Sequence, residues 1–526
     1  MRKCISILLL LVMALSVGSA AYLENAPKTG GTVVVGLSYE PDTMNVYSTH
    51  LLGDVQATMV EGLLVPDENM TYQPVLALET PSLENGLIVI NEGNTMDITY
   101  HLRQDVLWHD GEKFTAEDVV FTWEALSNDA WDAESKDGVD QVSSIDTPDD
   151  YTVIVHYKAA FTDFASTLFT FGILPKHVCE GVDLNENTGY NVAPIGTGPY
   201  KFSEWAPGEY IKVVANTDYY GDGPYLDAIY FRFITDENTR IAQLKTGEID
   251  FAYGLTYENY DEVSAIEGTT AYTMSMNSWR YMAFNNNKPG LDEVAVRQAI
   301  AYAIDRDALV NQLFNGIPNV WSQPWQPKDP FAVQGFEGYK YNPEKSAALL
   351  DEAGWVLNGS GVREKDGETL SFTISCVAGR AVDEAVEQVV MAYLDEVGIK
   401  LTIDNAAAST QTARLYAGEF ELACGGWIVS PTTSRSFLYG TGEVLNRGRW
   451  SNAEFDKIIY AIDFAMDEAE RKELVAQAVK IFNEELPELA LFNTVDIVCM
   501  NSRLKGVKLN PTNMTHFCQS GSWYLD

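Results

Sequence analysis

The sequence predicts an α/β protein built from several domains. Strand patterns alternate with helical patterns along most of the chain, which is typical of sheets covered by helices. Residues 370–424 show the order strand, helix, strand, helix, strand, and this pattern predicts a doubly wound unit with parallel strands. The chain has 526 residues, which at about 100–200 residues per domain allows two to four domains.

Strands dominate the first half of the chain. Their expected positions are 32–37, 97–102, 151–157, 210–215 and 229–234. We expect a helix over 116–126, because Thr115 can cap its first turn and Asp118 stands three residues later in a capping box. Asp236 starts a second helix that runs to Gly247.

Helical patterns are more frequent in the second half. The apolar positions of 294–314 predict one long helix. Asn342 followed by Pro343 predicts a helix that stops at Gly354. The doubly wound unit has strands at 370–376, 400–403 and 420–424, with helices at 382–397 and around 410–416. Because no low-complexity linker separates the parts, we expect the chain to leave one domain and return to it.

The first 21 residues predict a signal peptide. Arg2 and Lys3 precede an apolar run over 5–17, which is too short for a comfortable membrane span, and small residues follow up to Ala21. An uncleaved N-terminal anchor is the alternative. No cysteine stands at the cleavage position, so the chain is not expected to be a lipobox lipoprotein. We expect an exported protein, periplasmic or on the extracellular face of the membrane.

The net charge of the chain limits the classes of partner that it can bind. It has 35 basic and 75 acidic residues, a formal net charge of −40. Phosphate backbones are bound by clustered Lys and Arg, so this balance excludes nucleic acid as a partner and disfavours anionic lipid surfaces.

Sequence motifs for catalysis are missing. The chain contains no GxSxG, HExxH or GxxxxGK motif, and its six histidines have no metal-ligand spacing. We therefore expect no enzyme activity, no catalytic residue, no cofactor and no metal site. A glycosidase pair of carboxylates is neither indicated nor excluded among so many acidic residues.

Seven motifs follow one another in the order and spacing of a known family. They are LRQDVLWHDGEKFTAEDVVFTWEAL (102–126), ILPKHV (173–178), PIGTGPYKFSEW (194–205), LKTGEIDFA (244–252), VAVRQAIAYAIDRDALV (294–310), YNPEKSAALLDEAGW (341–355) and SNAEFDKII (451–459). From residue 32 to about 523 the chain resembles family 5 of the extracellular solute-binding proteins of ABC transporters, which includes oligopeptide-, dipeptide- and nickel-binding proteins.

The resemblance implies a periplasmic-binding-protein-like fold, with two lobes, a hinge and an extra domain (the three-domain, cluster C type). Domain I would comprise 28–54, 186–280 and 496–526, domain II 55–185 and domain III 281–495, with hinge crossings near 276–284 and 494–500. The implied function is capture of a small solute, a peptide or similar, by lobe closure. A monomer would then deliver the solute to ABC permease and ATPase subunits.

The resemblance also points to a ligand-binding segment. Peptide-binding members hold the peptide's amino terminus with an Asp three residues after a Trp, and the matching positions here are Trp427 and Ser430. A serine cannot form that ion pair, so recognition of a free amino terminus is open. We expect Trp427 to stack on the ligand, Ser430 to offer a neutral hydrogen bond, and an arginine downstream to favour an anionic group; the candidates are Arg435, Arg447 and Arg449.

Further candidates for the cleft are aromatic residues and one histidine. Tyr39 and His50 lie on the loop after the first strand, which by resemblance faces ligand. Trp131 and Trp325 are further candidates, and Trp279 is expected near the hinge with Tyr281. Three alternatives stay open: a nickel-chelate or metallophore binder that uses His50, an oligosaccharide binder with stacked Trp faces, and a receptor that presents solute to a membrane sensor.

Two cysteines are expected to be neighbours. Cys376 and Cys424 end the first and third strands of the doubly wound unit, which usually lie side by side about 4.8 Å apart. In an oxidising compartment they could form a disulfide; the alternatives are two buried thiols, or a pair between Cys499 and Cys518.

Overall fold

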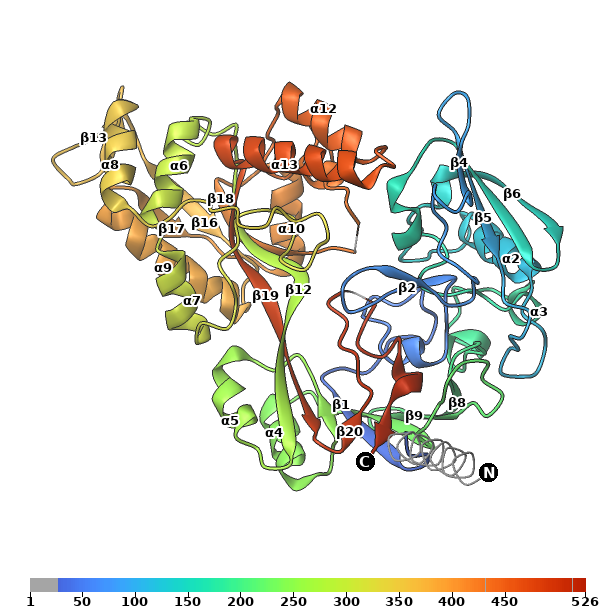
Figure 1. Ribbon diagram of the computed structural model, residues 1–526. Coiled ribbons are helices and arrows are strands. Elements are labelled where there is room, and N and C mark those ends of the chain that lie inside the picture. Colours follow the sequence, from blue (N-terminus) through green and yellow to red (C-terminus); the bar gives the residue numbers. More distant parts are fainter. Residues whose placement is uncertain (1–26, 431, 513) are drawn as a thin grey trace, which may run out of the picture.

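The computed structural model describes residues 27–430, 432–512 and 514–526, so the predicted signal peptide 1–21 lies outside the described residues (Figure 1). A ten-stranded mixed sheet passes through both lobes in the order β17-β16-β18-β12-β19-β11-β1-β10-β9-β8. Together with the helices packed on it, this sheet confirms the α/β class. No helix formed by the described residues is long and apolar enough to cross a membrane.

The lower part of Figure 1, which we call the base, holds one end of this sheet. Strand β1 (Thr32–Leu37) pairs in parallel with β10 (Ala228–Phe233) and β11 (Phe251–Ala252). The other base elements are β8 (Tyr200–Ala206), β9 (Tyr210–Ala215), α4 (Glu237–Thr246), α5 (Tyr260–Ser264), β20 (Leu504–Lys505) and β21 (Tyr524–Leu525). Asp236 caps α4 by accepting from the N–H of Thr239 at 2.7 Å, as its sequence predicts.

A side body lies at the upper right of Figure 1, above the β8 and β9 end of the base. Its four-stranded sheet has the order β4-β5-β7-β6, and its own buried core lies within residues 47–190. Its elements are β2 (Leu64–Pro66), β3 (Tyr72–Pro74), β4 (Ile88–Ile90), β5 (Met96–His101), β6 (Val142–Asp149), β7 (Thr152–Tyr157), α2 (Ala116–Leu126) and α3 (Lys176–Cys179). The predicted capping box of α2 is present, with the Thr115 N–H donating to Asp118 at 3.0 Å.

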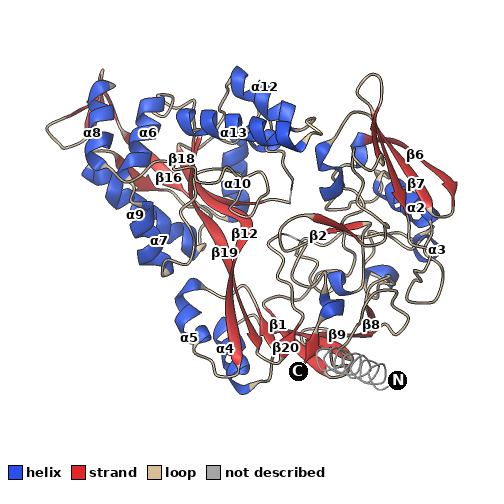
Figure 2. Cartoon of the chain, in the orientation of Figure 1, coloured by secondary structure: helices blue, strands red, loops and turns tan. Residues whose placement is uncertain are grey.

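The second lobe, at the upper left of Figure 1, contains the predicted doubly wound unit and is rich in helices (Figure 2). Strands β16 (Ser371–Ser375), β17 (Lys400–Ile403) and β18 (Leu422–Ile428) are parallel. The connecting helices are α9 (Ala381–Glu396) and α10 (Ala408–Ala417). The remaining elements are α8 (Pro343–Glu352), α11 (Ser436–Tyr439), α12 (Ala453–Ile462), α13 (Glu468–Glu485), β13 (Val356–Leu357), β14 (Arg363–Lys365) and β15 (Glu368–Thr369).

The prediction of a single helix over 294–314 is wrong. Two helices occupy this stretch, α6 (Val294–Ala303) and α7 (Arg306–Phe314). Ile304 is extended, and the Asp305 side chain accepts from the N–H of Ala308 at 2.8 Å. Asp305 is therefore the N-cap of α7, and the capping preference of aspartate outweighs the continuous apolar pattern.

Two long antiparallel strands cross between the base and the second lobe: β12 (Thr269–Phe284) and β19 (Glu488–Asn501) (Figure 1). Their register shifts between Ser275 and Trp279, where a β-bulge interrupts the ladder. Beyond the bulge, alternate residues of β12 enter two cores: Tyr281 faces one and Met282 the other.

Candidate functional site

The bulge in β12 brings the base and the second lobe together at Asn277. Its backbone N–H donates to the carbonyl of Pro511 in the base at 2.8 Å, and its carbonyl accepts from the N–H of Val429 in the second lobe at 3.1 Å. A bulge releases these backbone groups from the strand ladder and re-aims the side chain. The hinge region thus holds the loop that follows β18.

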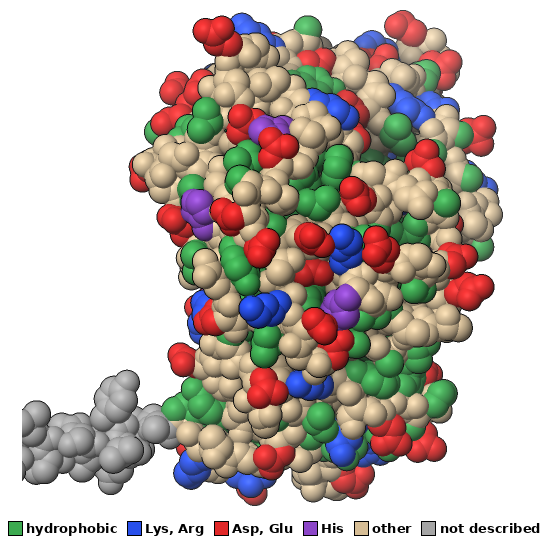
Figure 3. All heavy atoms as spheres, turned by 90° about the vertical axis from the view of Figure 1, so that its right-hand side faces the viewer, with side chains coloured by type: hydrophobic (Ala, Val, Ile, Leu, Met, Phe, Trp, Pro, Cys, Tyr) green, Lys and Arg blue, Asp and Glu red, His purple; other side chains and the backbone are tan. Residues whose placement is uncertain are grey.

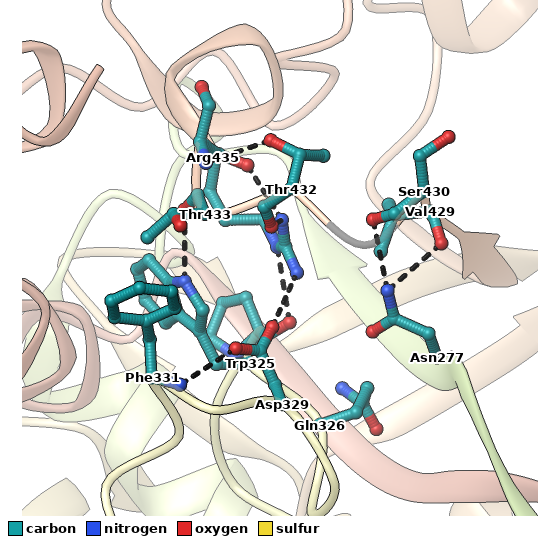
Figure 4. A network of polar contacts seen from close by, with 12 residues as sticks. Asn277, Trp325, Gln326, Asp329, Phe331, Val429, Ser430, Thr432, Thr433 and Arg435 are labelled. Atoms are coloured by element: carbon teal, nitrogen blue, oxygen red, sulfur yellow. Dashed lines mark hydrogen bonds and ion pairs between the residues drawn. The ribbon is translucent and has the colours of Figure 1, made fainter. Parts of the chain in front are cut away.

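The Asn277 side chain orders this loop. Its amide nitrogen donates to the carbonyls of Val429 and Ser430, both at 3.0 Å (Figure 4). Its amide oxygen is buried and accepts no hydrogen bond from the described residues. The loop leaves the carboxyl end of a parallel strand, where open α/β sheets commonly bind ligands.

The same loop touches the side body. Thr432 donates its hydroxyl hydrogen to Asp163, and the Thr433 N–H donates to the second carboxylate oxygen at 3.2 Å. Nearby, the Thr162 N–H donates to the carbonyl of Asp463 at 3.1 Å. Burial raises the pKa of Asp163 despite these hydrogen bonds.

A cavity of about 320 Å³ lies at this junction between the side body and the second lobe. Its lining is rich in hydroxyl and charged groups, with a few apolar side chains: Met70, Thr71, Tyr72, Thr80, Thr162, Asp163, Ala165, Ser166, Asp329, Pro330, Phe331, Thr432, Thr433, Glu468 and Arg471. Such a lining suits a polar solute that offers hydrogen-bond donors.

Arg435 and Trp325 are buried in the second lobe and donate hydrogen bonds to the loop. The prediction that they contact the solute is therefore wrong. Arg435 is fully buried, donates to the carbonyls of Thr432 and Ser434 at 2.7 Å each, and pairs with Asp329 at 3.4 Å (Figure 4). Trp325 is 1% exposed, and its indole N–H donates to the carbonyl of Thr433 at 3.0 Å. Burial raises the pKa of Asp329 to about 6 even beside this guanidinium.

Trp279 belongs to the interior of the second lobe, and Trp427 packs against the same core while staying partly exposed. Trp279 lies at the end of the bulge in β12, but it is fully buried and cannot contact solute. The Trp427 ring stacks on Tyr281 at 5.6 Å between centroids, and the Arg447 guanidinium lies over it at 4.4 Å. Trp427 is partly exposed and lines a small cavity together with Arg447, so its stacking on a ligand stays a prediction.

Two further second-lobe candidates differ in position. Ser430 is partly buried at the start of the loop, and its carbonyl accepts from the Thr432 N–H at 2.7 Å as well as from Asn277. Arg449 donates to the carbonyl of Tyr416, outside the junction cavity. Of the segment expected to bind solute, the structure therefore brings the Ser430 loop to the junction and leaves the arginines in other contacts.

The first-half candidates lie around a different part of the molecule. The Tyr39 hydroxyl donates to Asp54 and to the carbonyl of Leu52 at 3.1 Å. His50 is exposed and pairs with Glu134 at 2.8 Å. Trp131 is 4% exposed in the core of the side body, so its expected place in the cleft is wrong. A second cavity of about 160 Å³ lies near this loop, lined mostly by apolar residues.

The strands at Cys376 and Cys424 are neighbours, as predicted, but the two cysteines form no disulfide. Strands β16 and β18 are direct neighbours, with Ser375 opposite Ala423. Both cysteines are free and buried, and Cys499 and Cys518 are free as well.

Sequence reasoning missed Asp163, Asn277 and Thr432. Asn277 had a usable signal, because asparagine is depleted in strands and often marks an irregularity there. Asp163 and Thr432 lie 269 positions apart and meet only through the arrangement of the lobes. No local pattern distinguishes Asp163 from the many other acidic residues of the chain, and acidic side chains are scattered over the face drawn in Figure 3.

A sheet shared by two lobes, two crossing strands with a bulge and a cavity where the bodies meet define a two-lobed solute-binding protein. Residues 72–446 match the model of a protein family described as "Bacterial extracellular solute-binding proteins, family 5 Middle". The chain belongs to this family, as its sequence motifs predicted.

Its relatives include both peptide- and nickel-binding proteins. The chain is 30% identical to the oligopeptide-binding protein AppA of Bacillus subtilis over 96% of both chains. The structure of that protein in complex with a nonapeptide covers 95% of this chain and all of its own, with a TM-score of 0.75 and 28% identity. NikZ of Campylobacter jejuni in complex with Ni(L-His) has a TM-score of 0.75 and 25% identity, over 94% of this chain and 99% of its own.

Proposed function

We propose that this protein captures a peptide or peptide-like solute between its lobes and passes it, chemically unchanged, to the permease and ATPase subunits of an ABC importer. The observation that carries the proposal is the loop after β18. It bonds to the hinge residue Asn277 and to Asp163 of the side body, beside a cavity of about 320 Å³. A solute there would contact parts that move relative to one another.

The proposal includes the location and the division of the chain. The segment 1–21 directs export, and the mature protein acts outside the cytoplasm as a monomer. Domains I, II and III have the boundaries implied by the resemblance. Closure is a hinge motion of β12 and β19 near 276–284 and 494–500.

Native mass spectrometry of the purified protein tests this proposal, because a tightly held solute is carried through purification. We expect a peptide-sized organic ligand, and small-angle scattering should show a more compact protein when that ligand is added back. Steady conversion of the ligand, or unchanged scattering at saturation, would contradict the proposal.

A nickel chelate is the second candidate, favoured by the similarity to NikZ, whose structure contains Ni(L-His). Elemental analysis of the same purified sample separates the two. Stoichiometric nickel together with a small chelator would support this candidate against a peptide.

A further inference from the structure

Asp163 places a carboxylate without a counter-ion where the two bodies meet. Its hydrogen-bond donors are neutral: the Thr432 hydroxyl and the Thr433 N–H at 3.2 Å. In the described part of the chain, no basic side chain forms an ion pair with it. A partly buried carboxylate in this position is costly unless a positive charge reaches it.

The basic groups around the cavity have other partners. Arg435 pairs with Asp329, and Lys472 pairs with Glu468 at 2.6 Å. The Arg471 guanidinium donates to the carbonyl of Ala465 at 2.8 Å and lies over the Phe331 ring. None of these basic groups forms an ion pair with Asp163. Burial raises the pKa of Asp163 and outweighs the charges of Arg435 and Arg471, which lower it.

A second acid adds to this imbalance. Asp463 accepts from the Ser436 hydroxyl at 2.6 Å, while its other oxygen has no hydrogen-bond partner among the described residues. Burial raises the pKa of Asp463 to about 6, with a smaller contribution from the negative charge of the neighbouring Asp163.

The hydroxyl of Thr162 provides an independent observation. This residue lines the cavity, is 8% exposed, and its Oγ1 has no hydrogen-bond partner in the described chain. Buried hydroxyl groups normally have a partner. A cavity of about 320 Å³ is far larger than the roughly 10–15 Å³ that one water needs, so it can take an organic group.

We propose that this cavity holds a positively charged group of the solute, an ammonium or a guanidinium, with Asp163 as its counter-ion and the Thr162 hydroxyl as a further acceptor. The inference rests on the proposed function and specifies its solute class. Ser430 supplies no charge in the second lobe, so the counter-ion comes from the side body. Because Asp163 also binds Thr432 and Thr433, the cation favours the closed arrangement, and the net charge of −40 favours its approach.

Calorimetric titration of the full mature protein with three tetrapeptides tests the inference. The probes are tetra-alanine, its N-acetylated form, and N-acetyl-Ala-Lys-Ala-Ala. We expect N-acetyl-tetra-alanine, which has no cation, to bind at least tenfold more weakly than the better of the other two. Which of those two is better distinguishes a terminal ammonium from a side-chain ammonium.

Three variants locate the effect. Asp163→Asn keeps the shape and one of the two acceptor oxygens, and it should abolish the preference for a cationic probe. Thr432→Val removes a contact between the bodies without changing charge, and it should weaken all probes by the same factor. Asp132→Asn changes an exposed acid of the side body and should leave every affinity unchanged.

Equal binding of the acetylated and cationic probes would overturn the inference and leave the proposed function standing. A full preference retained by Asp163→Asn would overturn the role of Asp163. If no probe binds and scattering shows no closure with any of them, the peptide function fails, and the inference fails with it.

Discussion

Trp279 and Trp427 lie opposite each other on β12 and β18, and their indole N–H groups donate to the two oxygens of one carboxylate. This carboxylate belongs to Glu488, which is 6% exposed and also accepts from the Tyr439 hydroxyl at 2.9 Å. Burial raises the pKa of Glu488 to about 7, although three donors and the nearby Arg447 oppose the shift. The core of the second lobe thus contains an acid that titrates near neutral pH.

The first prediction concerns the pH dependence of stability. Between pH 4.5 and 7 the folded protein keeps the Glu488 proton that the unfolded chain has released, so the free energy of unfolding falls as the pH rises. The glutamine of the variant Glu488→Gln cannot titrate. Over this pH range the free energy of unfolding should therefore fall by up to about 3 kcal/mol less in the variant than in the wild type. Urea unfolding at several pH values measures the difference. Equal pH slopes would contradict it, and the exposed Glu84→Gln is the control.

The second prediction separates the hydrogen bond of Trp279 from its size. Trp279→Phe loses volume and a bond to Glu488, whereas Trp523→Phe loses volume alone, because the buried indole N–H of Trp523 has no acceptor among the described residues. We expect Trp279→Phe to be more destabilising by about 1–2 kcal/mol. Chemical unfolding of the two variants checks this, and equal losses would show that the bond adds nothing.

The third prediction tests the role of Asn277 in ordering the binding loop. Asn277→Ala leaves the carbonyls of Val429 and Ser430 without their side-chain donor, and solute affinity should fall at least tenfold. Asn285→Ala is a matched control, because Asn285 is equally buried and also donates to two carbonyls, those of Gly418 and Phe420.

Amide hydrogen exchange also compares Asn277→Ala with Asn285→Ala, by measuring how well the loop is ordered in each variant. Faster exchange should be confined to the loop around 429–435 in Asn277→Ala. If both variants bind solute equally well, the loop does not depend on Asn277.

The fourth prediction concerns the buried thiols. Cys376 and Cys424 should react with an alkylating reagent in denaturant without prior reduction, because both are free. In the native protein the reaction should be slow, since burial raises the pKa of both thiols and lowers the thiolate fraction. Peptide mapping would contradict this if it found the two cysteines linked.

Much of the fold could be predicted from local patterns. The helix after Thr115 and the parallel unit around β16 follow from caps, apolar periods and strand lengths that act over a few residues. The break at Asp305 was missed because an apolar period says nothing of a polar cap inside it.

The site could be predicted only in outline. The segment around Ser430 was found through the family resemblance, which matches Trp427 and Ser430 to a ligand-binding segment. Tryptophan, however, fills cores as readily as clefts, and Trp131 and Trp325 were assigned to the wrong environment. The charge of Arg435 is neutralised inside the lobe by Asp329, which is 106 positions away, so spacing could not reveal that pairing.

The two crossing strands also constrain how the chain folds. Strand β11 pairs with β19, so Phe251 finds its neighbour Met500 only when almost the whole chain is available. The second lobe is inserted between these partners, and the closure of so large a loop carries an entropic cost. The base therefore cannot complete its sheet until the strand over Glu488–Asn501 has been synthesised. Contacts of this sequence separation slow folding.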